Sequence, residues 1–122
     1  MTDSDDLFEW LRRSAFRQRF HLREAERDTL RHEGLDAVMG LAAAFIARRL
    51  VPAEPLDEWR YTPKRGHPVF VAQHATATCC RGCLSKWHGI PKGHELTAPE
   101  TAHVLAALRR WLVEQEGEGP HE

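Results

Sequence analysis

Two stretches of this chain repeat apolar residues every three or four positions, and they constrain its fold more than any other feature. The first predicts an amphipathic helix over residues 35–50, which Pro52 stops. The second predicts a C-terminal helix that begins after a capping box formed by Thr97 and Glu100. The apolar positions are Leu35, Val38, Met39, Ala42, Phe45, Ile46 and Leu50 in the first helix and Val104, Leu105, Leu108, Trp111 and Leu112 in the second.

The remaining segments predict shorter elements. Residues 5–17 predict a first helix with acidic caps, and residues 22–32 a mostly polar second helix after which Gly34 allows a left-handed cap. Residues 52–68 contain four prolines and predict an irregular connection. The short apolar run PVFVA, residues 68–72, predicts a strand or extended segment, although it has no evident partner strand. Trp59 and Tyr61 are expected to anchor the connection to the body of the protein.

The length of the chain fits one domain with a modest core. At 122 residues, with 42% hydrophobic and 29% charged residues, it falls in the globular range. We therefore expect a single domain over residues 1–122 with acidic flexible ends at about 1–4 and 117–122. The predicted fold class is mainly α, a compact bundle of three to five helices with a short extended segment and a metal knuckle.

Three cysteines lie within five positions, Cys79, Cys80 and Cys83, and four histidines flank them between His67 and His94. The chain has no apolar run of the roughly 20 residues that span a bilayer, and its acidic start lacks the pattern of a secretory signal, so we expect a cytoplasmic protein without a membrane partner. In a reducing compartment an odd cysteine cluster favours metal or reactive-thiol chemistry over disulfides.

Zinc is the predicted metal, because it takes four thiolate or imidazole ligands in a tetrahedron. Cys80 and Cys83 form a C-x-x-C pair, and His74 and His88 are the nearest complements, so the predicted site is a closed Cys2His2 set. On an uninterrupted helix His88 would lie about 140° around the axis from Cys83, so it can close the site only if the helix ends first. Cys79 competes with Cys80 as a ligand.

Several alternatives stay open at this point. His67 and His94 also compete as ligands, and their ordinary roles are a turn residue and a loop residue. A hydrolytic metalloenzyme would keep three protein ligands and one water, with Glu95 or a spare histidine as base. A thiol-redox protein would use a free Cys79 or Cys80 beside a cation, here Arg81. An iron–sulfur cluster is less favoured, because the spacing matches none of the usual four-cysteine patterns.

Residues 12–31 are rich in arginine, with seven arginines against three acidic residues. Such a segment can bind the phosphates of a nucleic acid or an acidic protein. The alternative is that the arginines cover the solvent side of helices and pair with nearby acids, as Arg27 can with Glu24 and Arg31 with Asp28. An isoelectric point of about 6.7 favours this second interpretation.

The block HPVFVAQHATATCCRGCLSKWHGIPKGHELT, together with the upstream FHLREAERDTL and the middle helix, resembles a small bacterial family catalogued only as a domain of unknown function. The resemblance extends from about Phe16 to Trp111, and its most specific part is H-A-T-A-T-C-C-R-G-C-L. It implies family membership and no activity. The residues that match its motif are His74, Cys79, Cys80, Cys83, Trp87 and His88. The leading hypothesis is thus a zinc-stabilised binding module for nucleic acid or protein.

Overall fold

The computed structural model describes residues 1–54 and 62–118, and all regular structure in these two ranges is helical. The predicted mainly α class is confirmed. The described residues hold seven α-helices and one π-helical turn, more than the three to five expected, because several helices are very short. The elements are α1 (Ser4–Arg13), α2 (Ala15–Gln18), α3 (Glu24–Glu33), α4 (Leu35–Arg49), α5 (Pro68–Ala75), α6 (Arg81–Cys83), the π-helical turn η2 (Leu84–His88) and α7 (Ala98–Glu118).

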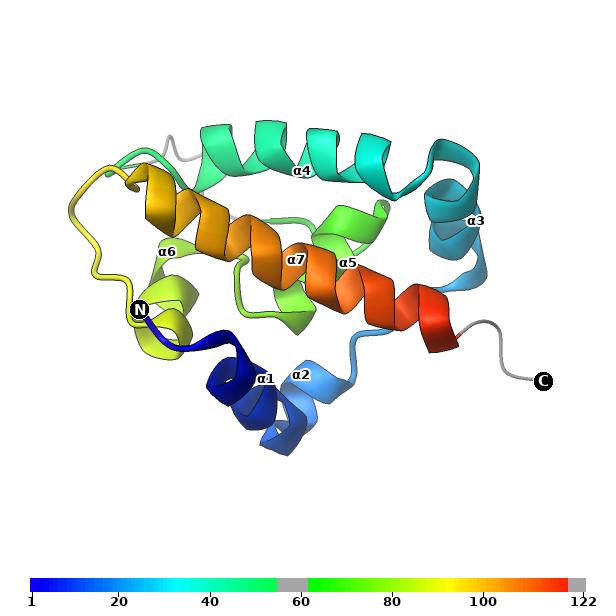
Figure 1. Cartoon of the computed structure of the whole chain (residues 1–122), viewed down its shortest axis with the longest axis horizontal. Helices are drawn as coiled ribbons and strands as arrows, with labels where there is room; N and C mark the ends of the chain where they lie inside the picture. The colour runs from blue at the N-terminus through cyan, green and yellow to red at the C-terminus, as the bar shows by residue number, and fades with distance from the viewer. Residues whose placement is uncertain (55–61, 119–122) are drawn as a thin grey trace.

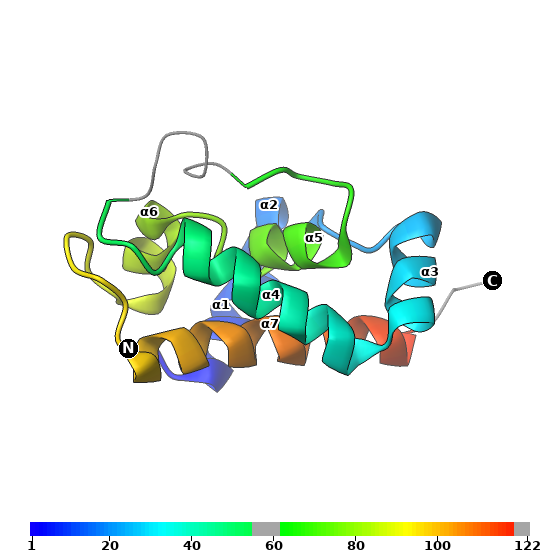
Figure 2. The same ribbon diagram turned by 90° about the horizontal axis from the view of Figure 1, so that it is seen from above.

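The two long helices predicted from apolar periodicity, α4 and α7, are confirmed and pack against each other (Figures 1 and 2). Helix α7 runs along the length of the molecule, and α5 packs against α7, α4, α3 and α2. The predicted capping box is also present, since Thr97 N donates to Glu100 Oε1 at 2.9 Å and Glu100 N donates to Thr97 Oγ1 at 3.2 Å. Apolar side chains buried in this core include Val38, Ala42, Ile46, Val104, Leu108 and Leu112.

The helix predicted over residues 5–17 is divided at Ser14. Its backbone N–H caps the end of α1 by donating to Leu11 O at 3.1 Å, and its hydroxyl oxygen caps α2 by accepting from Arg17 N at 3.1 Å. The chain start, expected to be flexible, is tied to the body through Thr2 N, which donates to His88 O at 2.7 Å. After the break at Ser14, Arg17 and Phe20 are buried, whereas the other residues of the stretch 15–20 stay exposed.

Helices α3 and α4 meet at Gly34, whose φ of 86° confirms that this glycine provides the break that the sequence predicted. Glu26 of α3 is buried and ties α3 to the segment before α5. Its carboxylate accepts from Arg23 N at 2.9 Å and Gly66 N at 3.3 Å and pairs with Arg65 at 3.2 Å.

The extended segment predicted at residues 68–72 is wrong, because these residues form the first part of α5. His67 caps this helix, since its Nδ1 accepts from Val69 N at 3.1 Å, and Pro68 occupies the first turn, where a missing N–H costs nothing. Helix α5 is buried on nearly all sides. A helix without a polar face has no 3.6-residue periodicity, so its sequence cannot be distinguished from that of a buried strand.

Trp59 and Tyr61, expected to act as anchors, lie outside the described residues, as do residues 119–122 of the predicted flexible end. Within the described ranges, no helix combines the length and the apolar character needed to cross a bilayer.

Candidate metal centre

A buried loop, residues 76–78, carries the chain from α5 to the cysteines. Thr76, Ala77 and Thr78 are fully buried, and their polar groups are paired within the protein. Thr76 Oγ1 donates to Ala72 O at 2.7 Å, and the side chain of Gln73 donates to Thr78 O at 3.1 Å. Ala77 has a φ of 59°, which is uncommon for a residue with a Cβ and persists only where the surroundings enforce it. The A-T-A-T motif therefore encodes a rigid support that fixes the direction of Cys79.

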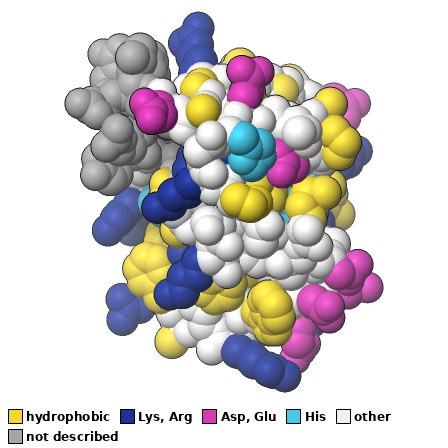
Figure 3. Space-filling view, turned by 90° about the vertical axis from the view of Figure 1, so that its left-hand side faces the viewer, with side chains coloured by type: hydrophobic (Ala, Val, Ile, Leu, Met, Phe, Trp, Pro, Cys, Tyr) yellow, Lys and Arg dark blue, Asp and Glu magenta, His cyan; other side chains and the backbone are white. Residues whose placement is uncertain are grey.

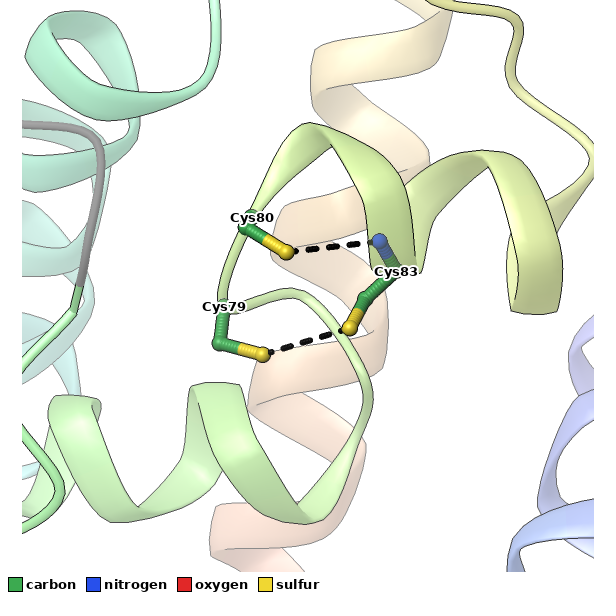
Figure 4. A group of neighbouring side chains, drawn as sticks. All are labelled: Cys79, Cys80 and Cys83. Carbon is green, nitrogen blue, oxygen red and sulfur yellow. Dashed lines mark hydrogen bonds between the residues drawn. The ribbon is translucent and has the colours of Figure 1, made fainter.

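The three cysteine sulfurs gather at the start of the next helix (Figure 4). Cys80 is the N-cap of α6, where its Sγ accepts from Cys83 N at 3.4 Å. Cys79 Sγ lies 3.6 Å from Cys83 Sγ, and all three sulfurs lie within 4.8 Å of one another. In a tetrahedral site with metal–sulfur bonds of about 2.3 Å, neighbouring sulfurs are about 3.8 Å apart. The three cysteines thus lie at separations that one metal ion can bridge with little movement.

Arg17 of α2 points its guanidinium group at these sulfurs. Its Nη2 donates to Cys83 Sγ at 3.3 Å, and its Nη1 donates to His74 O at 2.7 Å and lies 3.9 Å from Cys79 Sγ. Arg17 is only 7% exposed, and no described carboxylate lies within ion-pair distance of it. A guanidinium group stays protonated in proteins, so this buried positive charge requires negative charge nearby. Among the groups that it contacts, only the cysteines can supply it.

The surroundings shift the pKa values of two cysteines in opposite directions. Hydrogen bonds from the thiols of Cys79 and Cys83 and from the backbone at the helix start lower the pKa of Cys80, against the effect of burial. Donation of its proton to the neighbouring sulfurs, together with burial, raises the pKa of Cys79. Of these two thiols Cys80 is therefore the one that ionises more readily, and it is also half-buried rather than enclosed.

The structure does not bring His74 or His88 into the group of sulfurs. Helix η2 continues through His88 and ends at Gly89, so the early helix end that His88 required does not occur. His88 is fully buried, and both its ring nitrogens are engaged, Nε2 with Thr76 O at 2.8 Å and Nδ1 with His103 Nε2 at 3.0 Å. His103 of α7 is half-buried, and its ring packs against that of His88.

His74 is held differently. Its Nε2 lies 3.0 Å from Thr62 O, which can only accept, so Nε2 carries the proton and only Nδ1 could bind a metal. The ring stacks on Phe20 with the two centroids 5.4 Å apart. His67 and His94 also lie outside the group of sulfurs. The first caps α5, and the second pairs with Glu100 at 2.8 Å.

Arg81, expected to be the cation beside the thiols, has a structural role instead. Its guanidinium group donates to the carbonyl oxygens of Leu50, Pro52 and Pro91, each at 3.0 Å. These bonds tie the end of α4 to the loop after η2. Arg17 provides the positive charge at the cysteines, and sequence reasoning missed it because it grouped Arg17 with the arginines of a solvent-facing helix. The available signal was Ser14, a strong helix N-cap residue within the predicted helix.

Most other arginines of the segment 12–31 have partners within the protein. Arg12 and Arg13 pair with Glu9 at 3.0 and 3.3 Å. The predicted pair of Arg31 with Asp28 is confirmed at 2.8 Å. Arg27 donates to the backbone oxygens of Leu22 at 3.3 Å and of Gln115 at 2.9 Å. The segment is therefore largely used in internal contacts rather than forming a continuous free basic face.

Comparison with known proteins places the chain in a family. The model of the family described as "Domain of unknown function (DUF4186)" matches residues 5–113, nearly the whole chain, so the protein belongs to this family. The resemblance noted from the cysteine motif is confirmed. No solved structure matches the fold at a significant level.

Proposed function

We propose that this protein is a zinc-binding module in which Cys79, Cys80 and Cys83 hold the ion and the fourth coordination position accepts an external ligand. The observation that carries the proposal is the buried Arg17, whose guanidinium group faces the sulfurs at 3.3 Å from Cys83 Sγ without a described carboxylate partner. Three thiolates around Zn²⁺ with a neutral fourth ligand carry a net charge of about −1. One arginine balances this charge, so the buried site as a whole is neutral.

The chemistry of the ligands favours zinc. Thiolates prefer soft or borderline ions, and Zn²⁺ accepts a tetrahedron with any combination of sulfur and nitrogen ligands. Three thiolates donate so much charge to the ion that a bound water is acidified less than in sites with imidazole ligands. We therefore favour a binding role over the hydrolytic alternative. A reduced cysteine cluster of this kind also fits the expected cytoplasmic location.

The fourth ligand can be water, a group of a partner molecule or an imidazole of this chain. His74 is the better histidine candidate, because Nδ1 stays available while Nε2 donates to Thr62 O, an arrangement common for metal-bound histidines. His88 would have to break a hydrogen bond in the protein interior. If a protein or nucleic acid binds residues 12–31, as the sequence predicts, it must bind the exposed arginines of this segment. Arg17 is not available to it, because its guanidinium group donates to Cys83 Sγ.

Metal analysis of protein purified anaerobically without added metal tests the proposal. We expect about one zinc per chain, and X-ray absorption at the zinc edge showing three sulfur ligands and one lighter ligand. Cys79→Ser, Cys80→Ser and Cys83→Ser should each reduce zinc binding strongly, whereas His88→Gln should not. His74→Ala should reduce zinc binding if the imidazole of His74 is the fourth ligand and should leave it unchanged if that ligand is water. The proposal is overturned if the reduced protein neither contains zinc nor binds added zinc, or if the ion has two sulfurs and two imidazoles.

A thiol function is the second candidate, and the position of Cys80 favours it. Cys80 caps a helix start and its pKa is lowered, mainly by hydrogen bonds from the two other thiols, which are the conditions for a nucleophilic thiolate. Alkylation of metal-free protein with iodoacetamide, followed by mass spectrometry, should modify Cys80 before Cys79. Strong zinc binding together with slow alkylation of the metal-bound form would favour the metal function.

A further inference from the structure

Next to the cysteine cluster lies an open groove that contains two tryptophans and two cations. Residues of α1, the α1–α2 junction and η2 line this groove, which has a volume of about 410 Å³. The lining residues are Trp10, Arg13, Ser14, Lys86 and Trp87. We propose that this groove binds single-stranded nucleic acid, with bases stacked on the tryptophan rings and backbone phosphates near Arg13 and Lys86.

The exposure of the aromatic rings supports this proposal. Trp10 is 46% exposed, although tryptophan is usually buried in large part, and Trp87 is only half-buried. Neither tryptophan is a buried member of the core; Trp87 packs against the core with part of its ring, and Trp10 lies outside it. Exposed aromatic rings in a cationic groove are the common elements of proteins that bind single strands, because every base offers a flat π face.

The local charge also selects an anionic ligand. Arg13 and Lys86 line the groove, and Arg12, next to Arg13 in α1, shares Glu9 with Arg13 as its ion-pair partner. The pair of Arg13 with Glu9 is exposed, so a phosphate can displace it at little cost. Arg17 lies beneath the groove, with its Cζ 5.5 Å from the centroid of the Trp87 ring, but its charge is engaged by the cysteines, so Arg13 and Lys86 supply the positive charge for a ligand. The face that includes the α6 end of the molecule shows hydrophobic side chains interspersed with lysine and arginine side chains (Figure 3).

Other occupants fit this groove less well. A second copy of the chain would bring like charges together at Arg13 and Lys86, which opposes association. An acidic peptide would satisfy the cations but leave the two indole rings without flat partners. The overall charge of −1 does not conflict with a local site, because two cations, Arg13 and Lys86, line the groove itself. With about two phosphate contacts, the affinity should depend only moderately on salt.

Fluorescence anisotropy with a fluorescein-labelled oligothymidylate of about 12 nucleotides tests the proposal on the full chain as purified. We expect a plot of log affinity against log salt with a slope of about −1.4, which is the value for two phosphates. Trp10→Ala should weaken binding by about 5-fold to 150-fold, the range for loss of one stacked base, and Trp10→Phe should retain most of it. Lys86→Glu should weaken binding and flatten the salt dependence.

Matched controls are Val113→Ala and Arg109→Glu, which change one exposed apolar residue and one exposed arginine of α7. Both should bind the oligonucleotide like the unchanged protein. The inference is overturned if no oligothymidylate or oligouridylate binds, if Trp10→Ala binds as well as the controls, or if an unlabelled acidic peptide binds the groove in preference to the oligonucleotide. No cysteine lines the groove, so this result is separable from that of the zinc measurement.

Discussion

Replacing Arg17 with methionine should weaken zinc binding while leaving the stability of the metal-free fold largely unchanged. Methionine fills much of the volume of the arginine side chain but carries no charge and donates no hydrogen bond. In the zinc-loaded protein the three thiolates then lose their counter-charge. In the metal-free protein fewer thiolates remain to balance the buried charge of Arg17, and replacing such a charge by an apolar residue is often neutral or stabilising.

The size of the effect follows from the contact of 3.3 Å between Arg17 Nη2 and Cys83 Sγ. Two unit charges at that separation interact by about 5 kcal/mol at an effective dielectric constant of about 20. Cys80 and Cys83 are only half-buried, so solvent reduces this value. A charge-assisted hydrogen bond contributes about 1.5–3 kcal/mol net, and we therefore expect Arg17→Met to weaken zinc binding by about 10-fold to 150-fold.

Competition with a chromophoric chelator measures this affinity, and urea unfolding with and without zinc measures stability. Arg17→Lys should be intermediate, because a single ammonium group keeps the charge but cannot reproduce the planar fork of donors that reaches both His74 O and Cys83 Sγ. Arg12→Met, at an exposed arginine of α1, is the matched control and should bind zinc like the unchanged protein. Zinc affinity of Arg17→Met within threefold of the original would refute the charge argument, as would equal losses of stability with and without metal.

Three further substitutions test the supports of the site. Arg81→Met should lower the free energy of unfolding by about 2–4 kcal/mol in urea titrations, since three backbone carbonyls lose their donor, and an unchanged midpoint would contradict the role of Arg81 as a structural tie. Glu26→Gln should cost about 1–3 kcal/mol in the same assay, because Arg65 loses its ionised partner while the amide oxygen still accepts a backbone bond, and a loss no larger than that of an exposed pair would contradict this. Burial lowers the pKa of His88 to about 4, so between that value and about 6.5 the unfolded chain binds a proton that the folded chain does not, and stability should fall by about 2 kcal/mol from about pH 7 to about pH 5. His88→Gln should show a smaller loss over the same interval, and an equal loss would assign the effect to other groups.

The sequence predicts the helices with a polar face well and the enclosed ones poorly. Helices α4 and α7 have one buried side, so their apolar residues repeat with the helical period, and the Thr97 and Glu100 capping box marks where α7 starts. Helix α5 is surrounded by protein, and its apolar run therefore carries no period. The division between α1 and α2 depends on a single residue, Ser14. Such a boundary is hard to predict from the periodicity of apolar residues.

The sequence predicts where the cysteine sulfurs gather, whereas the side chains that approach them depend on tertiary structure. The close spacing of Cys79, Cys80 and Cys83 is local, and the sulfurs do gather at one helix start. Whether His88 joins them depends on where η2 ends, and η2 continues to Gly89, whose φ of 69° ends it, while the ring of His88 binds Thr76 and His103. The approach of Arg17 comes from a different part of the chain, and no spacing rule within the motif could reveal it.

Most residues of the motif H-A-T-A-T-C-C-R-G-C-L position the three cysteine sulfurs and are not themselves candidate ligands. Thr76 and Thr78 close the buried loop, and Arg81 fastens the helix start to α4, so these residues would be required even if no metal were bound. A Cβ at Gly82 would make ordinary contacts, 3.7 Å from Cys80 Sγ and 3.8 Å from Lys92 Nζ. Lys92 therefore lies on the Cys80 side of the cluster, whereas Arg17 contacts Cys79 and Cys83 directly. Because Lys92 is exposed to solvent, its loss should weaken zinc binding less than the loss of Arg17.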